Sequence, residues 1–203
     1  GSHSADLKEC DVAVAYQVMQ KVLEKLYGNE SFLSEVVGKI NQTMKVPVGL
    51  IASYWGGTNV QSWMTNEVFE NNAELKNLAD DTKPVNWAPT EPSVIYNSML
   101  HPLVNYNIAG AIWYQGEGNT GEPQNYGKLF EGLIKGWRKA FDKEFPFYFV
   151  QIAPWNGYWK NSAAYLREQQ ASVLSLPKTG MISVGDLVDN ISDIHPRIKK
   201  EVG

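Results

Sequence analysis

Apolar residues recur along the chain at two kinds of spacing. Over 10–27 they return every three or four positions, which predicts an amphipathic helix that ends at Gly28 and Asn29. Over 46–53 the run VPVGLIAS is short, apolar and β-branched, as is typical of a buried parallel strand. The same patterns predict further helices over 31–41, from near 66, over 93–104, 125–141 and 163–174, further strands over 108–114, 146–152 and 180–184, and a last helix at the C-terminus.

Strand and helix alternate from residue 46 onward, which indicates an α/β fold with a parallel sheet and helices on both faces. We expect one domain over 5–203, after a tag remnant at 1–4. Ligands of such sheets bind outside the carboxyl ends of the strands. The loops that follow Ser53, Tyr114 and Val184 are therefore the candidate site.

Composition and charge exclude several classes of function. The formal net charge is −4, which gives no electrostatic footprint for nucleic acid or for an anionic membrane. The apolar runs are too short to span a bilayer. The single cysteine, Cys10, excludes an internal disulfide and a cysteine-based zinc site. No signal peptide is visible.

Aromatic residues are frequent, and several tryptophans lie among turn residues: Trp55, Trp63, Trp155 and Trp159. Loop aromatics are common where sugars bind, because the apolar face of a sugar stacks on a ring. They also cap small cores, so both interpretations stay open.

Two of the candidate loops combine glycines with groups that can donate hydrogen bonds to a ligand. Adjacent glycines, Gly56 and Gly57, allow positive φ and present bare N–H groups, although an ordinary tight turn would have the same sequence. Gln115, Glu117 and Asn119 follow the strand over 108–114, where a polar side chain can donate to a developing oxyanion. Glu117 could instead cap the turn that follows.

The third loop contains His195, two residues after Asp193 and directly before a proline. A histidine on a loop shaped by proline is a candidate general base. His101 lies in a helical stretch, where we expect local packing or hydrogen bonding.

Six segments occur here in the order known from the sialate O-acetylesterase family: VGLIASYWGGTNVQSW, YNSMLHPL, IAGAIWYQGEGN, PFYFVQIAP, LREQQ and DIHPRIKKEVG. The chain resembles this family over 46–203. The family belongs to the SGNH hydrolases, so the resemblance implies a flavodoxin-like three-layer α/β/α fold.

The resemblance also implies roles for individual residues. His195 matches the catalytic base. The superfamily's orienting aspartate falls at Ser192, so Asp193 is a substitute candidate and a backbone carbonyl is another. Gly57 or Gly56 matches the oxyanion glycine, and Gln115, with Asn119 as runner-up, matches the side-chain donor. Arg167 and Glu168 match a helix for which we expect a structural role.

The family's nucleophile segment, GQSNM, has no counterpart in this sequence, and neither GDS nor GxSxG occurs. We therefore expect a partial domain whose sheet lacks its first strand. Ser53 is conceivable as a substitute nucleophile, although no glycine elbow flanks it.

Two functions follow from these residues: an esterase that removes O-acetyl groups from sialic acid or related glycans, or an inactive fragment or carbohydrate-binding remnant of the same fold. A nucleotide-binding domain is disfavoured because no P-loop motif occurs in the sequence.

We expect an O-acetylated sugar as substrate, and no cofactor or metal. An exposed sheet edge would favour a homo-oligomer or a complementing segment. The resemblance favours a periplasmic or secreted location.

Overall fold

A parallel five-stranded sheet forms the centre of the computed structural model, which describes residues 13–17, 32–198 and 200–203. The strands are β1 (Ala13–Gln17), β2 (Gly49–Ala52), β3 (Gly110–Trp113), β4 (Phe147–Val150) and β5 (Thr179–Ile182), in the spatial order β2-β1-β3-β4-β5. This is the flavodoxin-like order of doubly wound sheets. Because every pair is parallel, all five carboxyl ends lie at one edge.

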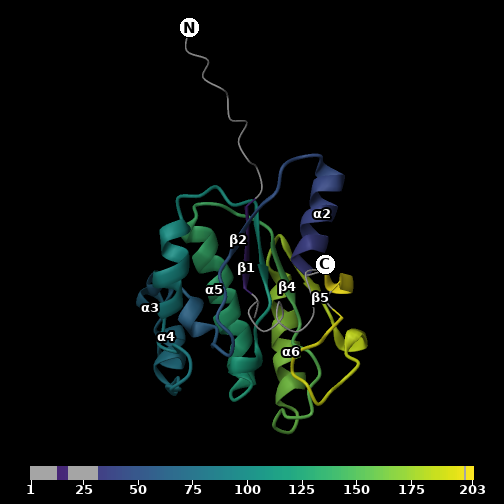
Figure 1. The fold of residues 1–203 in the computed structure, drawn as a ribbon. Coiled ribbons are helices and arrows are strands. Elements are labelled where there is room, and N and C mark those ends of the chain that lie inside the picture. The colour runs from purple at the N-terminus through teal and green to yellow at the C-terminus, as the bar shows by residue number, and fades with distance from the viewer. Residues whose placement is uncertain (1–12, 18–31, 199) are drawn as a thin grey trace.

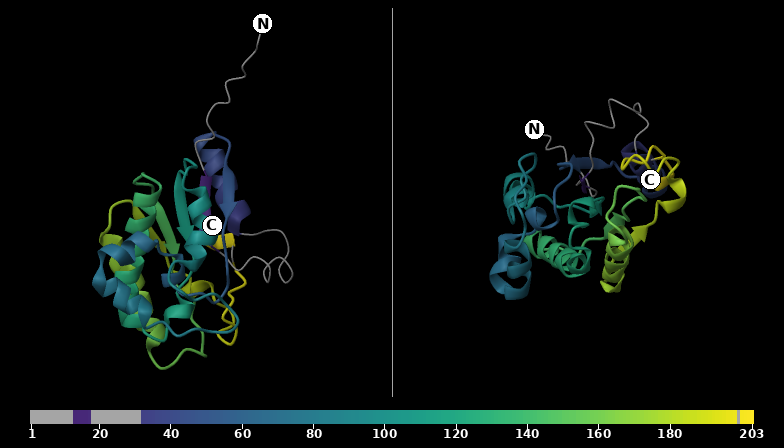
Figure 2. Two further views of the ribbon diagram at one scale, coloured as in Figure 1. Left: turned by 90° about the vertical axis from the view of Figure 1, so that its left-hand side faces the viewer. Right: turned by 90° about the horizontal axis from the view of Figure 1, so that it is seen from below.

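Helices cover both faces of the sheet, which makes three layers (Figure 1). The longer helices are α2 (Phe32–Met44), α3 (Asn66–Asn71), α4 (Ala73–Asp80), α5 (Tyr126–Ala140) and α6 (Ser162–Ser172). Figure 2 shows α5 and α6 against one face, and α2 with the C-terminal turn on the other. The short helical turns are η1 (Gln61–Trp63), η2 (Tyr96–Leu100), η3 (His101–Leu103), η4 (Glu117–Asn119), η5 (Pro123–Asn125), η6 (Val173–Ser175), η7 (Gly185–Leu187) and η8 (Lys200–Val202). The sequence-based α/β/α prediction is confirmed.

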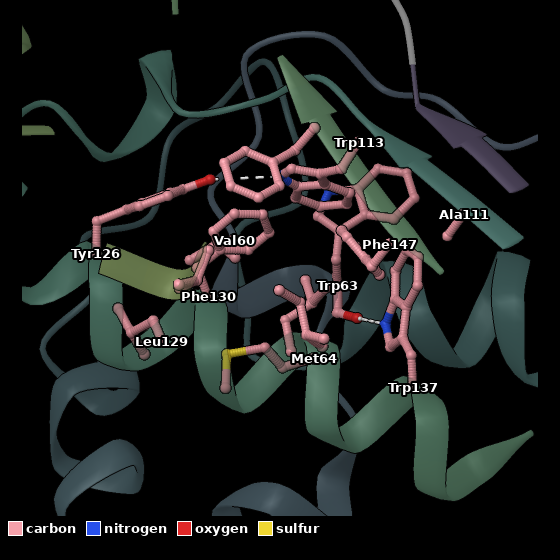
Figure 3. Packing of buried hydrophobic residues seen from close by; sticks show 14 of the residues in the cluster. Val60, Trp63, Met64, Ala111, Trp113, Tyr126, Leu129, Phe130, Trp137 and Phe147 are labelled. Atoms are coloured by element: carbon pink, nitrogen blue, oxygen red, sulfur yellow. Dashed lines mark hydrogen bonds between the residues drawn. The ribbon is translucent and has the colours of Figure 1, made fainter. Parts of the chain in front are cut away.

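The main core fills the space between the sheet and the layer that contains α5. The apolar side of α5, which includes Leu129, Phe130, Leu133 and Trp137, packs on the inward side chains of the strands. In Figure 3 the rings of Trp63, Trp113, Phe130 and Phe147 gather above this helix. The indoles of Trp113 and Trp137 meet edge to face with centroids 5.6 Å apart, a favourable geometry for two aromatic rings.

Among the described residues, those on the α2 side leave part of the sheet uncovered. Strand β4 alternates: Phe147 and Phe149 are buried, while Tyr148 between them is 55% exposed. An apolar groove of about 560 Å³ lies over β3, β4 and β5, and its lining includes Ile40 and Val202. None of the candidate site residues lines it.

One element differs from the sequence prediction. Ala13–Gln17 is a strand, so the helix predicted over 10–27 is wrong there, and the rest of that range lies outside the described residues. Ala13 pairs with Gly49 and Val14 with Gly110, so β1 takes the central position that we expected to be vacant. A segment between two strands satisfies two hydrogen-bonding ladders, and this outweighs helical periodicity in a run of alanine, valine and tyrosine.

The segment that fills the centre of the sheet is therefore the chain's own. The expected complementing segment is not needed at this position. Oligomerisation stays a prediction. Residues 18–30, which follow β1 in the sequence, contain no serine and therefore supply no candidate for the nucleophile.

The other predicted elements are confirmed, with boundaries shifted by a few residues. Two are shorter than predicted. The stretch 93–104 forms the turns η2 and η3, and the last predicted helix is the single turn η8.

Candidate active site

The loop after β2 folds into a tight turn closed by Thr58. Its Oγ1 donates to the Trp55 carbonyl oxygen at 2.8 Å and accepts the indole N–H of the buried Trp63 at 2.9 Å. Gly57 has φ +72°, a conformation that side chains with a Cβ rarely adopt. Within the described part of the chain, the N–H groups of Gly56 and Gly57 donate to no protein acceptor. They are thus available to a ligand.

A tryptophan from a distant loop packs directly against this turn. A Cβ placed on Gly57 would lie 2.2 Å from Cζ3 of Trp87, so the indole occupies the space next to the glycine. Trp87 is 61% exposed and Trp55 is 44% exposed. Of the loop tryptophans for which sugar stacking and core packing were both open, Trp63 is part of the core, whereas Trp159 is largely exposed. Sequence patterns did not identify Trp87.

The loop after β3 packs closely on the loop after β2. A Cβ at Gly118 would lie 2.5 Å from the Thr58 carbonyl oxygen, and one at Gly116 would lie 2.6 Å from Ile152. The glycines of QGEGN therefore serve close packing. This contact brings Gln115 and Asn119 against residues 58–61.

Gln115 and Asn119 form a buried hydrogen-bonded network. The Gln115 Nε2 atom donates to the Thr58 carbonyl oxygen at 2.9 Å and to Asn119 Oδ1 at 2.8 Å. Asn119 Oδ1 also accepts the Val60 N–H at 2.8 Å, and Asn119 Nδ2 donates to Gln61 Oε1 at 2.8 Å.

This network distinguishes the two side-chain donors that the resemblance implies by the number of N–H groups each has free. Both N–H bonds of Gln115 are already used, so its amide has none left for an oxyanion. Asn119 uses one of its two, and the other has no acceptor among the described residues. The geometry thus favours Asn119, the runner-up.

Three residues of this network were not predicted. Gln61 and Tyr126 are buried, and so is Gln170, whose amide accepts the Ile152 N–H and donates to the carbonyl oxygens of Gln115 and Val150. Gln170 ties the ends of β3 and β4 together. Its place on the apolar face of α6, four residues after Leu166, was the available signal.

Glu117 lies near two partly buried tyrosines, Tyr114 and Tyr158. Burial, and to a smaller extent the negative charge of Glu117, raises the pKa of Tyr114 and of Tyr158 well above the usual value. These phenols stay protonated and can donate hydrogen bonds at any working pH.

His195 and Asp193 are in direct contact on the loop after β5. The Asp193 Oδ1 atom lies 3.1 Å from His195 Nδ1 and accepts the His195 backbone N–H at 2.9 Å. These hydrogen bonds, the backbone one above all, lower the pKa of Asp193. Both side chains are about one-third exposed. Asp193 is placed to orient the imidazole from two residues before it.

The loop after β4 holds the histidine loop in position. Trp155 Nε1 donates to the Ser192 carbonyl oxygen at 3.3 Å, and the Asn156 N–H donates to the Ile191 carbonyl oxygen at 2.8 Å. The Trp155 ring meets Tyr158 edge to face at 5.1 Å. The Ser192 hydroxyl accepts a hydrogen bond from Asn156 Nδ2 at 3.3 Å, and no contact between it and the His195 ring is found among the described residues.

The other residues singled out from the sequence lie outside this hydrogen-bonded network and the histidine–aspartate pair. Ser53 is buried directly after β2. His101 is exposed and meets the Tyr96 ring edge to face at 6.1 Å, which agrees with local packing. The Arg167 carbonyl oxygen accepts from Gln151 at 2.9 Å and thereby attaches α6 to the end of β4, and Glu168 is exposed. Cys10 lies outside the described residues.

The described residues hold no cluster of three or more histidine, cysteine or acidic residues that could bind a metal ion. Among them, no helix has the length and hydropathy to cross a bilayer.

A parallel sheet in the order β2-β1-β3-β4-β5, with glycine and amide groups at one edge and a histidine–aspartate pair after the last strand, is the architecture of an SGNH-type hydrolase fold. The family model described as carbohydrate esterase, sialic acid-specific acetylesterase, matches residues 16–202. The chain belongs to this family.

Curated relatives agree with this assignment. The chain is 29% identical to the sialate O-acetylesterase of Rattus norvegicus over 228 aligned positions, which cover 87% of the chain and 42% of the rat protein. It is 31% identical to the sialate O-acetylesterase of Homo sapiens, over 94% of the chain and 41% of the human protein. The chain thus spans about two-fifths of the length of these relatives.

Solved structures share the fold. A carbohydrate acetylesterase from Xanthomonas citri superposes with a TM-score of 0.72 and 32% identity, over 84% of this chain and 38% of that one. The esterase AlinE4, in a mutant form, superposes with a TM-score of 0.50 and 10% identity over 86% of this chain and 76% of its own. The second likeness concerns the fold alone.

Proposed function

We propose that the chain acts in a carbohydrate esterase that removes O-acetyl groups from sialic acid or related glycans by serine-type acyl transfer. The observation that carries the proposal is the contact between Asp193 Oδ1 and His195 Nδ1, at the carboxyl edge of the sheet in a member of this esterase family. A histidine held in this way can act as a general base.

The hydrogen bond fixes which imidazole nitrogen reacts. With Nδ1–H donated to Asp193, the lone pair lies on Nε2 of His195. Nε2 takes the proton of a serine hydroxyl, and the serine oxygen bonds to the acetyl carbonyl carbon. When the tetrahedral intermediate collapses, the bond to the sugar oxygen breaks and His195 returns the proton to that oxygen. Water then attacks the acyl-serine by the same route and releases acetate.

Negative charge on the former carbonyl oxygen requires donors. The free N–H of Gly57, or that of Gly56, and the second Nδ2–H of Asn119 supply them in this proposal. Loss of one such donor typically costs about 2.7–4 kcal/mol of transition-state stabilisation. Trp87 and Trp55, exposed beside Gly57, offer ring faces on which a sugar can stack.

The nucleophilic serine of this mechanism is not yet assigned to a residue. Ser53 is the candidate within the chain. Among the described residues, however, the one polar partner of the His195 ring is Asp193, and no serine hydroxyl bonds to it. This observation favours a second candidate function, in which the chain binds acetylated glycans without hydrolysing them.

Hydrolysis of p-nitrophenyl acetate distinguishes these possibilities. The esterase proposal predicts activity that is lost in His195→Ala. Loss in Ser53→Ala as well would identify Ser53 as the nucleophile, and survival in Ser53→Ala would point to another serine. Equal, background activity in the wild type and in His195→Ala would reject an autonomous esterase. Binding of an O-acetylated sialoside without acetate release would then support the second candidate.

A further inference from the structure

A continuous series of hydrogen bonds leads from the hydrophobic core to Asn119. The indole N–H of Trp113 donates to the Tyr126 hydroxyl at 3.2 Å, and the two groups point toward each other in Figure 3. The Tyr126 hydroxyl in turn lies 3.0 Å from Oε1 and 3.1 Å from the carbonyl oxygen of Gln115. The Gln115 amide then donates to Asn119 Oδ1 at 2.8 Å.

The direction of every bond in this series is fixed by groups that have a single role. An indole N–H can only donate, so Tyr126 must give its own proton to Gln115. The Thr58 carbonyl oxygen can only accept, so the group of Gln115 that faces it is the nitrogen, and Oε1 faces Tyr126. The amide of Gln115 therefore has one possible orientation.

The orientation of Asn119 follows from the same logic. Its Oδ1 receives two donors, the backbone N–H of Val60 and the Gln115 amide. Nδ2 is thereby turned the other way, toward Gln61 Oε1, and its second N–H is left for a ligand. Without the Gln115 donor, only the Val60 N–H and Gln61 Oε1 would hold the amide of Asn119.

Tyr126 suits this task because of where it lies. It is fully buried at the start of α5, and its ring packs against Phe130 with centroids 5.3 Å apart. Burial raises the pKa of its phenol far above the usual value, so the proton that it donates is present at every working pH.

We propose that Tyr126 is a positioning residue that acts through Gln115 to set the amide orientation of Asn119. The inference rests on the proposed function only insofar as Asn119 serves as an oxyanion donor. The orientation itself is a property of the folded chain.

The test is Tyr126→Phe, which removes the hydroxyl and keeps the ring. The matched control is Thr179→Val, which deletes a half-buried hydroxyl that donates to the Leu176 carbonyl oxygen at 2.8 Å, at the opposite edge of the sheet. The measurement is hydrogen exchange of the side-chain amide protons of Gln115 and Asn119 by NMR. We expect about tenfold faster exchange at both amides in Tyr126→Phe, and wild-type rates in Thr179→Val. Wild-type exchange at Asn119 in Tyr126→Phe would overturn the inference.

A second variant covers the case in which Tyr126→Phe does not fold. Gln115→Glu keeps the shape of the side chain, but its ionised carboxylate can donate to neither Asn119 Oδ1 nor the Thr58 carbonyl oxygen. The Asn119 amide signals should then depend on pH and return toward wild type as the introduced carboxyl group is protonated. Signals that match wild type at every pH would contradict the inference.

Catalysis gives a separate readout. If the chain is an active esterase, Tyr126→Phe should lower kcat about tenfold and leave KM unchanged, because an oxyanion donor acts in the transition state. A fall in kcat with a parallel rise in KM would indicate general loosening and count against the inference. Absence of activity in the wild type would reject the proposed function alone, since the exchange experiment still decides the orientation.

Discussion

Asp193 contacts His195 twice through one oxygen atom: Oδ1 accepts the backbone N–H at 2.9 Å and lies 3.1 Å from the ring Nδ1. The loop around this pair is held locally by Asn190, whose side chain accepts the Ser192 N–H at 3.0 Å. A carboxylate two residues before the histidine can therefore perform the task that the superfamily pattern gives to a position three residues before it. The backbone turn, rather than sequence spacing, brings the groups together.

Replacing Asp193 by asparagine should reduce esterase activity with little change in stability. Asparagine keeps an oxygen for the backbone N–H of His195, but the negative charge that stabilises the imidazolium is lost. We expect kcat to fall by at least about tenfold at unchanged KM. Asp189→Asn is the matched control, because it makes the same change at an exposed position of the same loop. An equal effect of both variants would show that charge near the loop, and not the contact with His195, matters.

The Asp193–His195 contact should weaken in acid. The folded-state pKa of Asp193 is lowered, so folding favours its ionised form. Its stabilising contribution is full above the pKa of an unfolded aspartate, about 3.9, and is lost as pH falls through the lower folded value. The backbone amide signal of His195 in NMR spectra should shift with this titration. A midpoint at or above the unfolded value would contradict the assigned cause.

Gly118→Ala should disturb the candidate site, whereas Gly121→Ala should not. The added Cβ at Gly118 would lie 2.5 Å from the Thr58 carbonyl oxygen, whereas a Cβ at Gly121 would meet no atom within 4 Å. We expect about 1–3 kcal/mol lower unfolding free energy for Gly118→Ala, and no loss for Gly121→Ala. Urea unfolding measures both. Similar values for the two variants would show that the loops after β2 and β3 are not tightly packed.

Gly57→Ala should displace Trp87. Its Cβ would overlap the indole, and φ at this position is +72°. In the double variant Gly57→Ala, Trp87→Ala, the overlap is removed and the backbone strain of about 1–2 kcal/mol remains. A double-mutant cycle on unfolding free energy should thus show a coupling between the two substitutions. Strict additivity would mean that Trp87 does not pack on Gly57.

The architecture could be read from the sequence because its signals are local. The apolar face of α5 and the β-branched runs of the central strands follow simple periods, and the glycine and histidine loops come directly after strands. The strand over 13–17 could not be read in this way. Its residues fit a helical period equally well, and only pairing with both β2 and β3 decides its conformation.

The distribution of roles within the site also required the structure. Gln115 and Asn119 both end in a carboxamide, so the residue types do not show which of the two has a free N–H. What separates them is the set of groups around each amide: Thr58 and Tyr126 for the first, Val60 and Gln61 for the second. These partners come from segments far apart in the chain, so no local pattern identifies which amide keeps a free N–H.

The most direct test of the account is the rate of acetate release from an O-acetylated sialoside by the wild-type chain and by His195→Ala. If His195 is the general base, the wild type releases acetate and the variant does so at a rate lower by about 10²–10⁴-fold, the usual contribution of a general base. Release at the same rate by both proteins would contradict the assignment of His195 as the base. No release by a folded wild-type chain would contradict esterase activity of this chain on its own.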